Sequence, residues 1–229
     1  MIRPILFNTE MVQAILEGRK TTTRRIIKGA NRNCYFLGSN KQNTKVSFAR
    51  TTTILPLRVK IPYQVGDILY VRETWMIQSM KNFEKNIKFL YKAVPQELKE
   101  VHVSNQRYED MLKFESKNGW QPSLFMPKEA ARIFLKVTGV RVEKLQDITE
   151  EGAKAEGAYK LAQSNPTKCV ENKDVDNGSY LNGFKRVWFK TLPKYYKDYA
   201  TFEGNPYVWV IEFQRVERPK DFIKGGDNE

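Results

Sequence analysis

The sequence predicts an α+β fold that is mainly β and is organised as a small closed or partly closed barrel. Several stretches carry the apolar patterns of strands and few carry those of helices, and the chain is extended both at residues 2–7 and at residues 207–216. The 229 residues, 41% of them hydrophobic, suffice for one well-buried core. We therefore expect a single domain over residues 1–217 and a disordered tail over residues 218–229.

The chain begins with a strand at residues 2–7 and a helix at residues 10–17. The apolar residues of the helix recur at helical spacing and form one face, made of Met11, Val12, Ile15 and Leu16. Thr9 can serve as its N-cap. Gly18 stands where a residue in the left-handed conformation would end the helix.

A strand rich in threonine and cationic residues follows at residues 20–27. Threonine is β-branched, and β-branched side chains favour extended backbone. Alternation along a strand gives two faces, one with Thr21, Thr23 and Arg25 and the other with Lys20, Thr22 and Arg24. Lys20 is the first residue after the turn, so it can also lie beside Thr23.

The next part of the chain predicts a loop, a hairpin and a strand. Residues 28–43 are rich in Gly, Asn, Lys and Ser and are expected to form the loop. Apolar and polar residues alternate over 46–48 and 54–61, as in a hairpin. The strand covers residues 68–75, with Glu73 on its apolar face. A buried carboxylate needs a cation or hydrogen-bond donors. The simpler expectation is an ion pair with an arginine, and the alternative is a catalytic or base-reading role.

The middle of the chain holds fewer clear elements. One strand is predicted at residues 87–93 within a polar, lysine-rich stretch, and another at residues 133–142. A short helix is expected to start at Thr149 and to end near Glu156. A carboxylate is unfavourable at the C-terminal end of a helix, so Glu156 calls for a cationic partner such as Lys20. The alternative is an exposed Glu156 without consequence.

The last part of the chain has a helix and a strand. The helix is predicted at residues 184–192, after a polar loop at residues 160–183, and the strand at residues 207–216. Three stretches are expected to be insertions into the domain, at about residues 29–53, 77–127 and 159–200.

The formal charge of +13 is the strongest signal in the composition. Such a charge attracts polyanions, of which nucleic acid is the commonest. The two cysteines, Cys34 and Cys169, and the single His102 are too few for a disulfide scaffold or a cysteine- or histidine-based metal site. We therefore expect no metal and no cofactor. With no export signal and no membrane-spanning run, a cytoplasmic protein without membrane contact is expected.

The stretch from Gly18 to Arg25 interleaves cations with hydroxyls and ends on an arginine. Most such clusters are solvated turns and strands. The density of hydroxyls between the cations instead suits an anionic or amide-bearing ligand, and the spacing alone leaves both interpretations open.

The pattern Gly18-x-Lys20-x-x-Thr23-x-Arg25 resembles the signature of the ASCH domain family. Three further blocks resemble the same family in the same order, at residues 66–73, 145–157 and 205–213. The amino-acid sequence of the blocks most resembles that of ASCH proteins of phages and prophages. The resemblance includes Trp120-Gln121-Pro122-Ser123 and Met126-Pro127. The resemblance implies a PUA-like β-barrel with short helices over its openings.

The resemblance also implies a function. Some ASCH proteins are small amidohydrolases that remove an acyl group from N4-acetylcytidine, and the positions that match their functional residues are Lys20, Thr23 and Glu156. A metal-independent amide hydrolysis needs a nucleophile, a proton shuttle and a group that stabilises the oxyanion. Thr23 would attack or position water, Lys20 would accept a proton or act electrostatically, and Glu156 would exchange protons with the leaving amine. Arg25 or a backbone N–H would hold the oxyanion.

Other ASCH proteins are treated as RNA-binding or coactivator modules, which gives the competing hypothesis of a non-catalytic reader of RNA or DNA. In that case Lys20, Arg24 and Arg25 would contact phosphates, and Trp75 or Tyr207 would stack a base. The candidate binding residues are Arg19, Arg24, Arg25, Glu73, Trp75 and Tyr207. The expected partner is then a modified cytidine nucleoside or RNA, with DNA as the alternative, and the sequence leaves the oligomeric state open.

Overall fold

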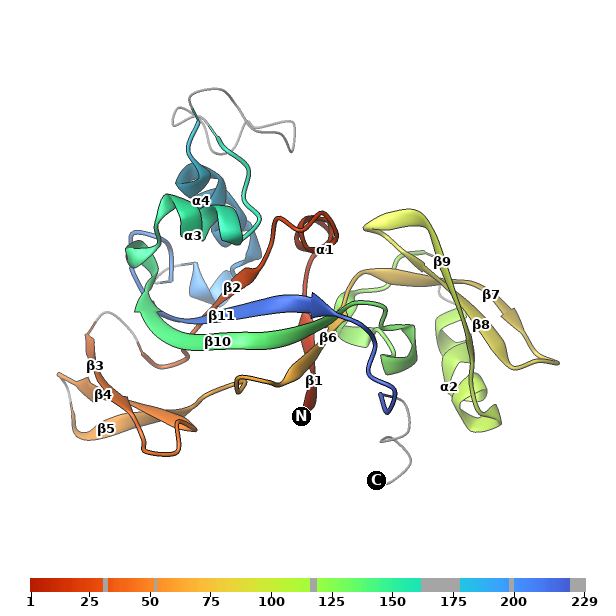
Figure 1. The fold of residues 1–229 in the computed structure, drawn as a ribbon, viewed down its shortest axis with the longest axis horizontal. Coiled ribbons are helices and arrows are strands. Elements are labelled where there is room, and N and C mark those ends of the chain that lie inside the picture. Colours follow the sequence, from red (N-terminus) through yellow and green to blue (C-terminus); the bar gives the residue numbers. More distant parts are fainter. Residues whose placement is uncertain (31–32, 52, 116–118, 162–177, 198–199, 223–229) are drawn as a thin grey trace. The chain divides into compact units, whose positions relative to one another are not determined.

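The computed structural model describes residues 1–30, 33–51, 53–115, 119–161, 178–197 and 200–222 (Figure 1). The chain divides into two compact units, each made of segments that are distant in the sequence. Unit 1 comprises Met1–Glu17, Asp67–Lys136 and Arg215–Glu229, and unit 2 comprises Gly18–Gly66 and Val137–Gln214. The single domain expected over residues 1–217 stays a prediction.

The described residues of unit 1 form five strands, two α-helices and the start of β10. Their bounds are β1 Ile2–Leu6, α1 Thr9–Leu16, β6 Ile68–Arg72, β7 Trp75–Lys81, β8 Asn86–Tyr91, β9 Val94–His102, α2 Asn105–Glu115 and β10 Phe134–Lys144. β1 pairs in parallel with β6, and β6 pairs antiparallel with the first three residues of β10. β7, β8 and β9 form a separate antiparallel sheet.

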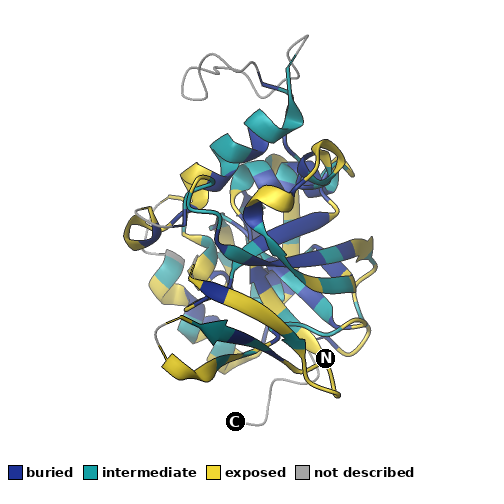
Figure 2. Ribbon diagram, turned by 90° about the vertical axis from the view of Figure 1, so that its left-hand side faces the viewer, coloured by how far each residue is buried: buried dark blue, intermediate teal, exposed yellow. Residues whose placement is uncertain are grey.

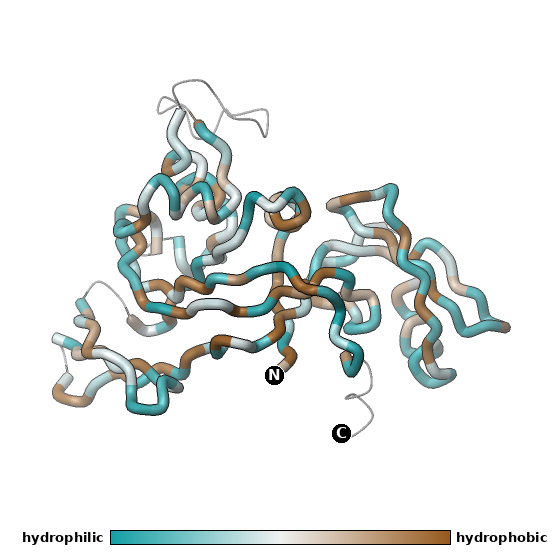
Figure 3. The backbone as a smooth tube through the Cα atoms, in the orientation of Figure 1, coloured by the Kyte–Doolittle hydropathy of each residue, from teal (hydrophilic) through white to brown (hydrophobic). Residues whose placement is uncertain are grey.

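Helix α1 follows directly from its sequence. Its apolar residues face inward, so that Met11, Val12 and Ile15 are buried, and its tube is mainly apolar in Figure 3. Gly18 has φ of 75°, the left-handed conformation expected at the end of the helix. The N-cap is Asn8 and not Thr9, because the Asn8 side chain accepts a hydrogen bond from Met11 N at 2.8 Å.

The core of unit 1 lies between the β7–β8–β9 sheet, helix α2 and the start of β10. Its members include Trp75, Phe89, Tyr91, Met126 and Phe134. Residues 77–127, expected as an insertion, contribute Phe89, Tyr91 and Met126 to this core. The single strand expected at residues 68–75 is interrupted at residues 73 and 74, between β6 and β7.

Phe222 belongs to the same core. It is 1% exposed, and its ring packs edge-on against Tyr70 at 5.1 Å and Phe134 at 4.7 Å between ring centroids. The expected disordered tail began at residue 218, so this expectation is corrected for residues 218–222, which the apolar contacts of Phe222 hold in place. Residues 223–229 of that tail lie outside the described residues.

Unit 2 contains two sheets and two helices. The bounds of its elements are β2 Thr22–Ile26, β3 Cys34–Ser39, β4 Lys45–Arg50, β5 Thr53–Lys60, α3 Glu150–Ala155, α4 Tyr180–Thr191 and β11 Tyr207–Val216, together with most of β10. The strand order is β10–β11–β2 in one sheet and β3–β4–β5 in the other. Figure 2 colours the chain by burial, and the strands carry both buried and exposed residues.

Helices α3 and α4 cover one face of the β11–β2 pair. Phe184 and Trp188 of α4 pack with Val208 and Val210 of β11, and Ile26 of β2 adjoins them. Tyr207 points to the other face, where its ring contacts Phe48 of β4 at 5.0 Å. The β3–β4–β5 sheet therefore lies on the side opposite to the two helices, as Figure 1 shows.

The structure confirms the mainly β fold class, with some differences in detail. β3 and the hairpin of β4 and β5 replace the loop and hairpin expected over residues 28–61, so the loop prediction is wrong for residues 34–39. β9 and α2 were not predicted. Among the described strands no sheet closes into a barrel. No helix in the described part of the chain is long and apolar enough to cross a membrane.

Candidate functional site

The start of β2 and the end of α3 are joined through their backbones in unit 2. Thr21 N donates to Ala155 O at 2.8 Å, and Lys20 and Glu156 form an isolated antiparallel bridge. Thr149 caps α3, because its hydroxyl accepts a hydrogen bond from Gly152 N at 3.1 Å. Glu156 is the C-cap of α3, in agreement with the position expected from the sequence. These backbone contacts bring Lys20 and Glu156 together.

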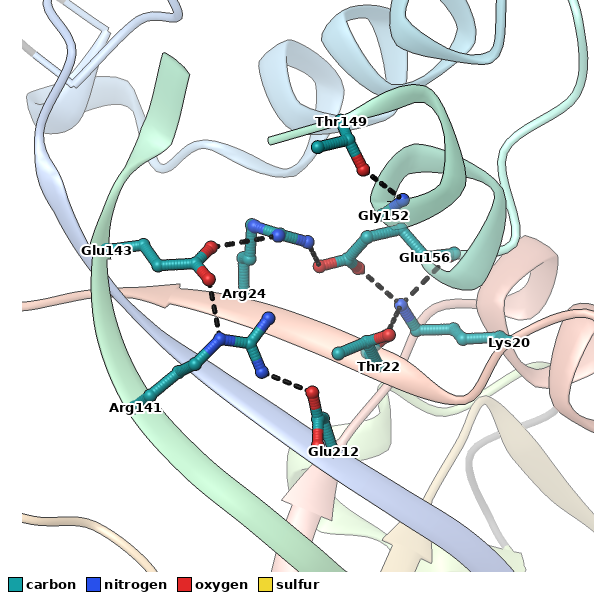
Figure 4. Close-up of polar contacts among 9 residues, drawn as sticks. All are labelled: Lys20, Thr22, Arg24, Arg141, Glu143, Thr149, Gly152, Glu156 and Glu212. Atoms are coloured by element: carbon teal, nitrogen blue, oxygen red, sulfur yellow. Dashed lines mark hydrogen bonds and ion pairs between the residues drawn. The ribbon is translucent and has the colours of Figure 1, made fainter. Parts of the chain in front are cut away.

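The side chains of Lys20 and Glu156 form a buried ion pair. Lys20 Nζ lies 2.6 Å from Glu156 Oε2 and also donates to Glu156 O at 3.0 Å and to Thr22 O at 2.7 Å (Figure 4). The Lys20 side chain is 0% exposed and that of Glu156 is 7% exposed. Burial lowers the pKa of Lys20, and the Glu156 carboxylate opposes this shift. Three oxygen acceptors match the three donors of an ammonium group.

The pair continues into a chain of alternating charges, called here the ion-pair chain. Arg24 Nη1 lies 3.3 Å from Glu156 Oε1, and Arg24 Nη2 lies 3.1 Å from Glu143 Oε2. Arg141 Nε contacts Glu143 Oε1 at 2.5 Å, and Arg141 Nη1 pairs with Glu212 (Figure 4). In order, the chain is Lys20, Glu156, Arg24, Glu143, Arg141 and Glu212.

The ion-pair chain runs from the interior to the surface. The Arg24 side chain is 3% exposed, whereas those of Arg141 and Glu212 are 46% and 44% exposed. Its three cations balance its three carboxylates. Arg24 Nε is buried and has no hydrogen-bond partner among the described residues, which is uncommon for a buried donor.

Strand register separates Thr23 from Arg24. Thr22 and Arg24 lie opposite Glu212 and Val210 of β11, whereas Thr23 and Arg25 lie opposite Ile211 and Trp209. Residues opposite each other in an antiparallel pair share a face, so Thr23 and Arg25 are on the face turned away from Arg24. Thr23 is 1% exposed. Burial lowers the pKa of Arg25, and the Glu156 carboxylate opposes this effect.

Arg19 reinforces the end of α3 from outside the ion-pair chain. Its guanidinium group lies over the Tyr159 ring at 4.2 Å from the centroid. It also donates to Gly157 O at 2.7 Å and to the Tyr159 hydroxyl at 2.6 Å. Arg19 therefore connects the turn before β2 to the segment that follows Glu156.

Glu73 and Trp75 lie in unit 1, so neither is part of this cluster. Glu73 accepts two hydrogen bonds from Arg132, at 2.9 and 3.0 Å, which is the arginine pairing expected from the sequence. Trp75 is 0% exposed and packs between Phe89 and Phe114, so its ring is not available to stack a base.

Tyr207 is committed to contacts within unit 2. Its ring packs against Phe48, its hydroxyl accepts from Phe36 N at 3.3 Å, and Lys144 Nζ lies 4.0 Å from the ring centroid. These contacts tie the β3–β4–β5 sheet to β11.

Sequence reasoning missed the outer half of the ion-pair chain, namely Arg141, Glu143 and Glu212. Arg141 and Glu143 are two residues apart on β10, so alternation puts both on one face. That spacing was the only available signal, because the partners Arg24 and Glu212 come from other strands.

Unit 1 contains a separate cavity of about 350 Å³. Arg72 and Arg107 at its wall are already bound, Arg72 to the carbonyl oxygen of Met126 and Arg107 to Glu129. The cavity is lined by Tyr70, Arg72, Arg107, Met111, Lys113, Phe114, Leu124, Phe125, Met126, Pro127 and Lys128. Within the described ranges no three His, Cys, Asp or Glu residues are grouped so that they could hold a metal ion.

Comparisons of the chain with protein-family models, with curated proteins and with solved structures gave no match.

Proposed function

We propose that this chain is an ASCH-type, PUA-like protein of the cytoplasm whose unit 2 hydrolyses the acyl amide of an N4-acylated cytidine. The reaction consumes one water and yields cytidine and a carboxylic acid. The observation that carries the proposal is the buried contact between Lys20 and Glu156, which are 136 residues apart in the sequence. These two residues match functional positions of the ASCH amidohydrolases that the sequence resembles.

The roles in the proposed reaction follow from the surroundings of each group. The three acceptors around Lys20 favour its ammonium form, so we assign Lys20 to electrostatic stabilisation of the charge that develops on the amide. Glu156 bonds both Lys20 and Arg24, and it exchanges the proton that the leaving cytosine amine needs. Thr23 attacks the amide or positions the attacking water, and Arg25 or a backbone N–H holds the oxyanion.

The face of β2 on which Thr23 lies limits where the substrate amide can bind. Catalysis by all three groups requires the amide to sit at the start of β2, where Lys20 and Glu156 meet and where Thr23 is three residues away along the strand. Because the register puts Thr23 and Arg25 on the face turned away from Arg24, the proposal requires the substrate to reach both faces at the start of β2.

The test is incubation of the protein with N4-acetylcytidine and detection of cytidine by chromatography. The wild type is expected to release cytidine, and Lys20→Met, Glu156→Gln and Thr23→Val are expected to lower kcat by at least about 100-fold. Thr22→Val is the matched control, because the Thr22 contact with Lys20 uses its backbone oxygen, which the substitution keeps. Absence of turnover by the wild type would reject the hydrolase proposal for this substrate.

A non-catalytic RNA- or DNA-binding module of phage origin is the alternative. In this alternative Lys20 and Glu156 have no catalytic role. Wild-type protein that binds N4-acetylcytidine or RNA without turnover, and whose Glu156→Gln variant binds as well, would favour this alternative.

A further inference from the structure

The positive charge of the chain is concentrated in one segment. The stretch from Gly18 to Gly66 contains no aspartate and no glutamate, whereas Glu17 and Asp67 stand immediately on either side of it. It contains eleven of the 39 lysines and arginines, which leaves a net charge of only +2 for the rest of the chain. The eleven are Arg19, Lys20, Arg24, Arg25, Lys28, Arg32, Lys41, Lys45, Arg50, Arg58 and Lys60.

This segment contains the β3–β4–β5 sheet, whose two faces differ. Val46 and Phe48 of β4 are buried on the face that packs against Tyr207. Lys45, Ser47 and Ala49 alternate with them and form the opposite face. We call this opposite face the cationic face.

The strand register arranges the cationic face in three rows. Lys45 lies opposite Lys60 in the first row, and Ser47 lies opposite Arg58 in the second. Ala49 lies opposite Tyr35 in the third row. Successive rows are about 7 Å apart, because they are two residues apart along β4.

The cations of this face differ from those of the ion-pair chain in their partners. Lys45, Arg58 and Lys60 are exposed, and none of the three forms an ion pair with any residue that the structure describes. Like charges directly opposite each other on a sheet destabilise it. The repulsion between Lys45 and Lys60 therefore destabilises the sheet, and an anion bound between them would offset this effect. Lys20 and Arg24, in contrast, are balanced by Glu156 and Glu143.

Tyr35 adds an aromatic surface to the same face. It is 63% exposed, and its cross-strand neighbour Ala49 is too small to cover the ring. An exposed aromatic ring beside cations on a sheet can stack an unpaired base while the cations contact the backbone phosphates. The bases of a duplex are stacked on each other and do not offer this contact.

We propose that the cationic face of the β3–β4–β5 sheet binds single-stranded nucleic acid, with Tyr35 stacking a base and with Lys45, Arg58 and Lys60 contacting phosphates. This surface is separate from Lys20, Glu156 and Trp75, and it does not depend on the proposed hydrolysis. It uses cations without carboxylate partners, whereas the cations of the ion-pair chain are already neutralised.

The test is fluorescence anisotropy of labelled oligo(U) and oligo(dT) of about 20 nucleotides, measured against salt concentration. Lys45→Gln/Arg58→Gln/Lys60→Gln is expected to reduce the slope of log affinity against log salt by about 2, because each lost phosphate contact removes about 0.7. Tyr35→Ala is expected to weaken binding about fivefold or more with little change in that slope. Both variants are expected to keep the turnover of N4-acetylcytidine, if the wild type has it.

A matched control distinguishes binding by this surface from binding that depends only on the net charge of the protein. Lys92→Gln/Lys136→Gln/Lys190→Gln removes the same charge from exposed positions outside the sheet, and it is expected to change the slope by less than about 1. Equal losses in the two triple variants would overturn the proposal, because binding would then follow net charge alone. Tighter binding of a duplex of the same sequence, or no binding by the wild type, would also overturn it. Circular dichroism of each variant confirms that the fold is kept.

Discussion

Lys20 Nζ and Glu156 Oε2 lie 2.6 Å apart in the interior of unit 2, and they join the start of β2 to the end of α3. Loss of Glu156 would leave the Lys20 ammonium buried without its carboxylate, and loss of Lys20 would leave Glu156 with Arg24 as its remaining cationic partner. The pair is also the inner end of the ion-pair chain that reaches the surface at Arg141 and Glu212. Because one end of the ion-pair chain is buried and the other is exposed, variants at the two ends can be compared with each other.

Removing the buried end of the ion-pair chain is expected to cost far more than removing the exposed end. Lys20→Met should lower the free energy of unfolding by about 3–5 kcal/mol, because Glu156 stays buried with less charge compensation. Arg141→Met should lower it by about 1 kcal/mol or less, since both groups of its pair with Glu212 are nearly half exposed. Urea denaturation followed by circular dichroism measures both, and similar losses in the two variants would contradict the prediction.

Two neighbouring residues at the start of α1 are expected to differ in their effect on stability, because only one of them caps the helix. Asn8→Ala is expected to lower the free energy of unfolding by about 1 kcal/mol, because it removes the acceptor for Met11 N. Thr9→Ala should change it by less than about 0.5 kcal/mol, since Thr9 is the first residue of the helix and not its cap. Thermal denaturation of the two variants checks the assignment, and a larger loss for Thr9→Ala would show that the cap is Thr9.

Gly183 in α4 has no room for a side chain. A Cβ at this position would lie 1.9 Å from the backbone oxygen of Tyr159, and a backbone atom cannot move aside as the end of a side chain can. Gly183→Ala is therefore expected to lower the free energy of unfolding by about 3 kcal/mol or more, at the upper end of overpacking effects. Gly152→Ala in α3 is the control, because its Cβ would meet only side-chain atoms, none closer than 3.2 Å. Its expected change is less than about 1 kcal/mol in either direction. Comparable melting temperatures for the two variants would refute the close approach of α4 to Tyr159.

Lys99 in unit 1 gives a prediction on pH. Burial, together with the nearby Arg218 and Arg132, lowers the pKa of Lys99 to about 8. The unfolded chain keeps the ordinary lysine pKa of about 10.4. Between about pH 8 and 10.4 the folded protein therefore binds fewer protons than the unfolded chain, so the contribution of Lys99 to the free energy of unfolding rises with pH in this window.

The comparison for Lys99 is made with Lys99→Gln. The free energy of unfolding of the wild type minus that of the variant is expected to increase from about pH 8 to pH 10 and to be flat below about pH 7. Urea denaturation at a series of pH values measures this difference. A difference that stays constant or falls across the window would contradict the lowered pKa.

The sequence allowed prediction of elements whose pattern is set by their own residues. Strand β11 was predicted with its observed bounds, because it opens with the uninterrupted apolar run 207–211. Helix α1 was predicted from its spacing and from Gly18. β3 was missed, because its residues are mostly exposed and show no clear alternation; it is held by its pairing with β4. β9 was missed for the same reason, since it contains Pro95 and buries only Val101.

The contacts of the candidate site could be predicted only where the local sequence called for a residue of opposite charge. Glu156 at the end of a helix calls for a cation, and the structure supplies Lys20, as the sequence suggested. Nothing local in the sequence required Glu143 to meet Arg24 or Arg141 to meet Glu212, because these contacts depend on which strands become neighbours. The faces of β2 were predicted by alternation, and the observed register puts Thr23 opposite Ile211 on the face away from Arg24.

Phe222 has a consequence for how the chain acquires its structure during synthesis. The ribosome makes the first residues of unit 1 long before Phe222, yet the core around Tyr70 and Phe134 includes this ring. All residues of unit 2 have been made once Gln214 is in place. The interior of unit 1 can therefore be completed only after all residues of unit 2 have been made.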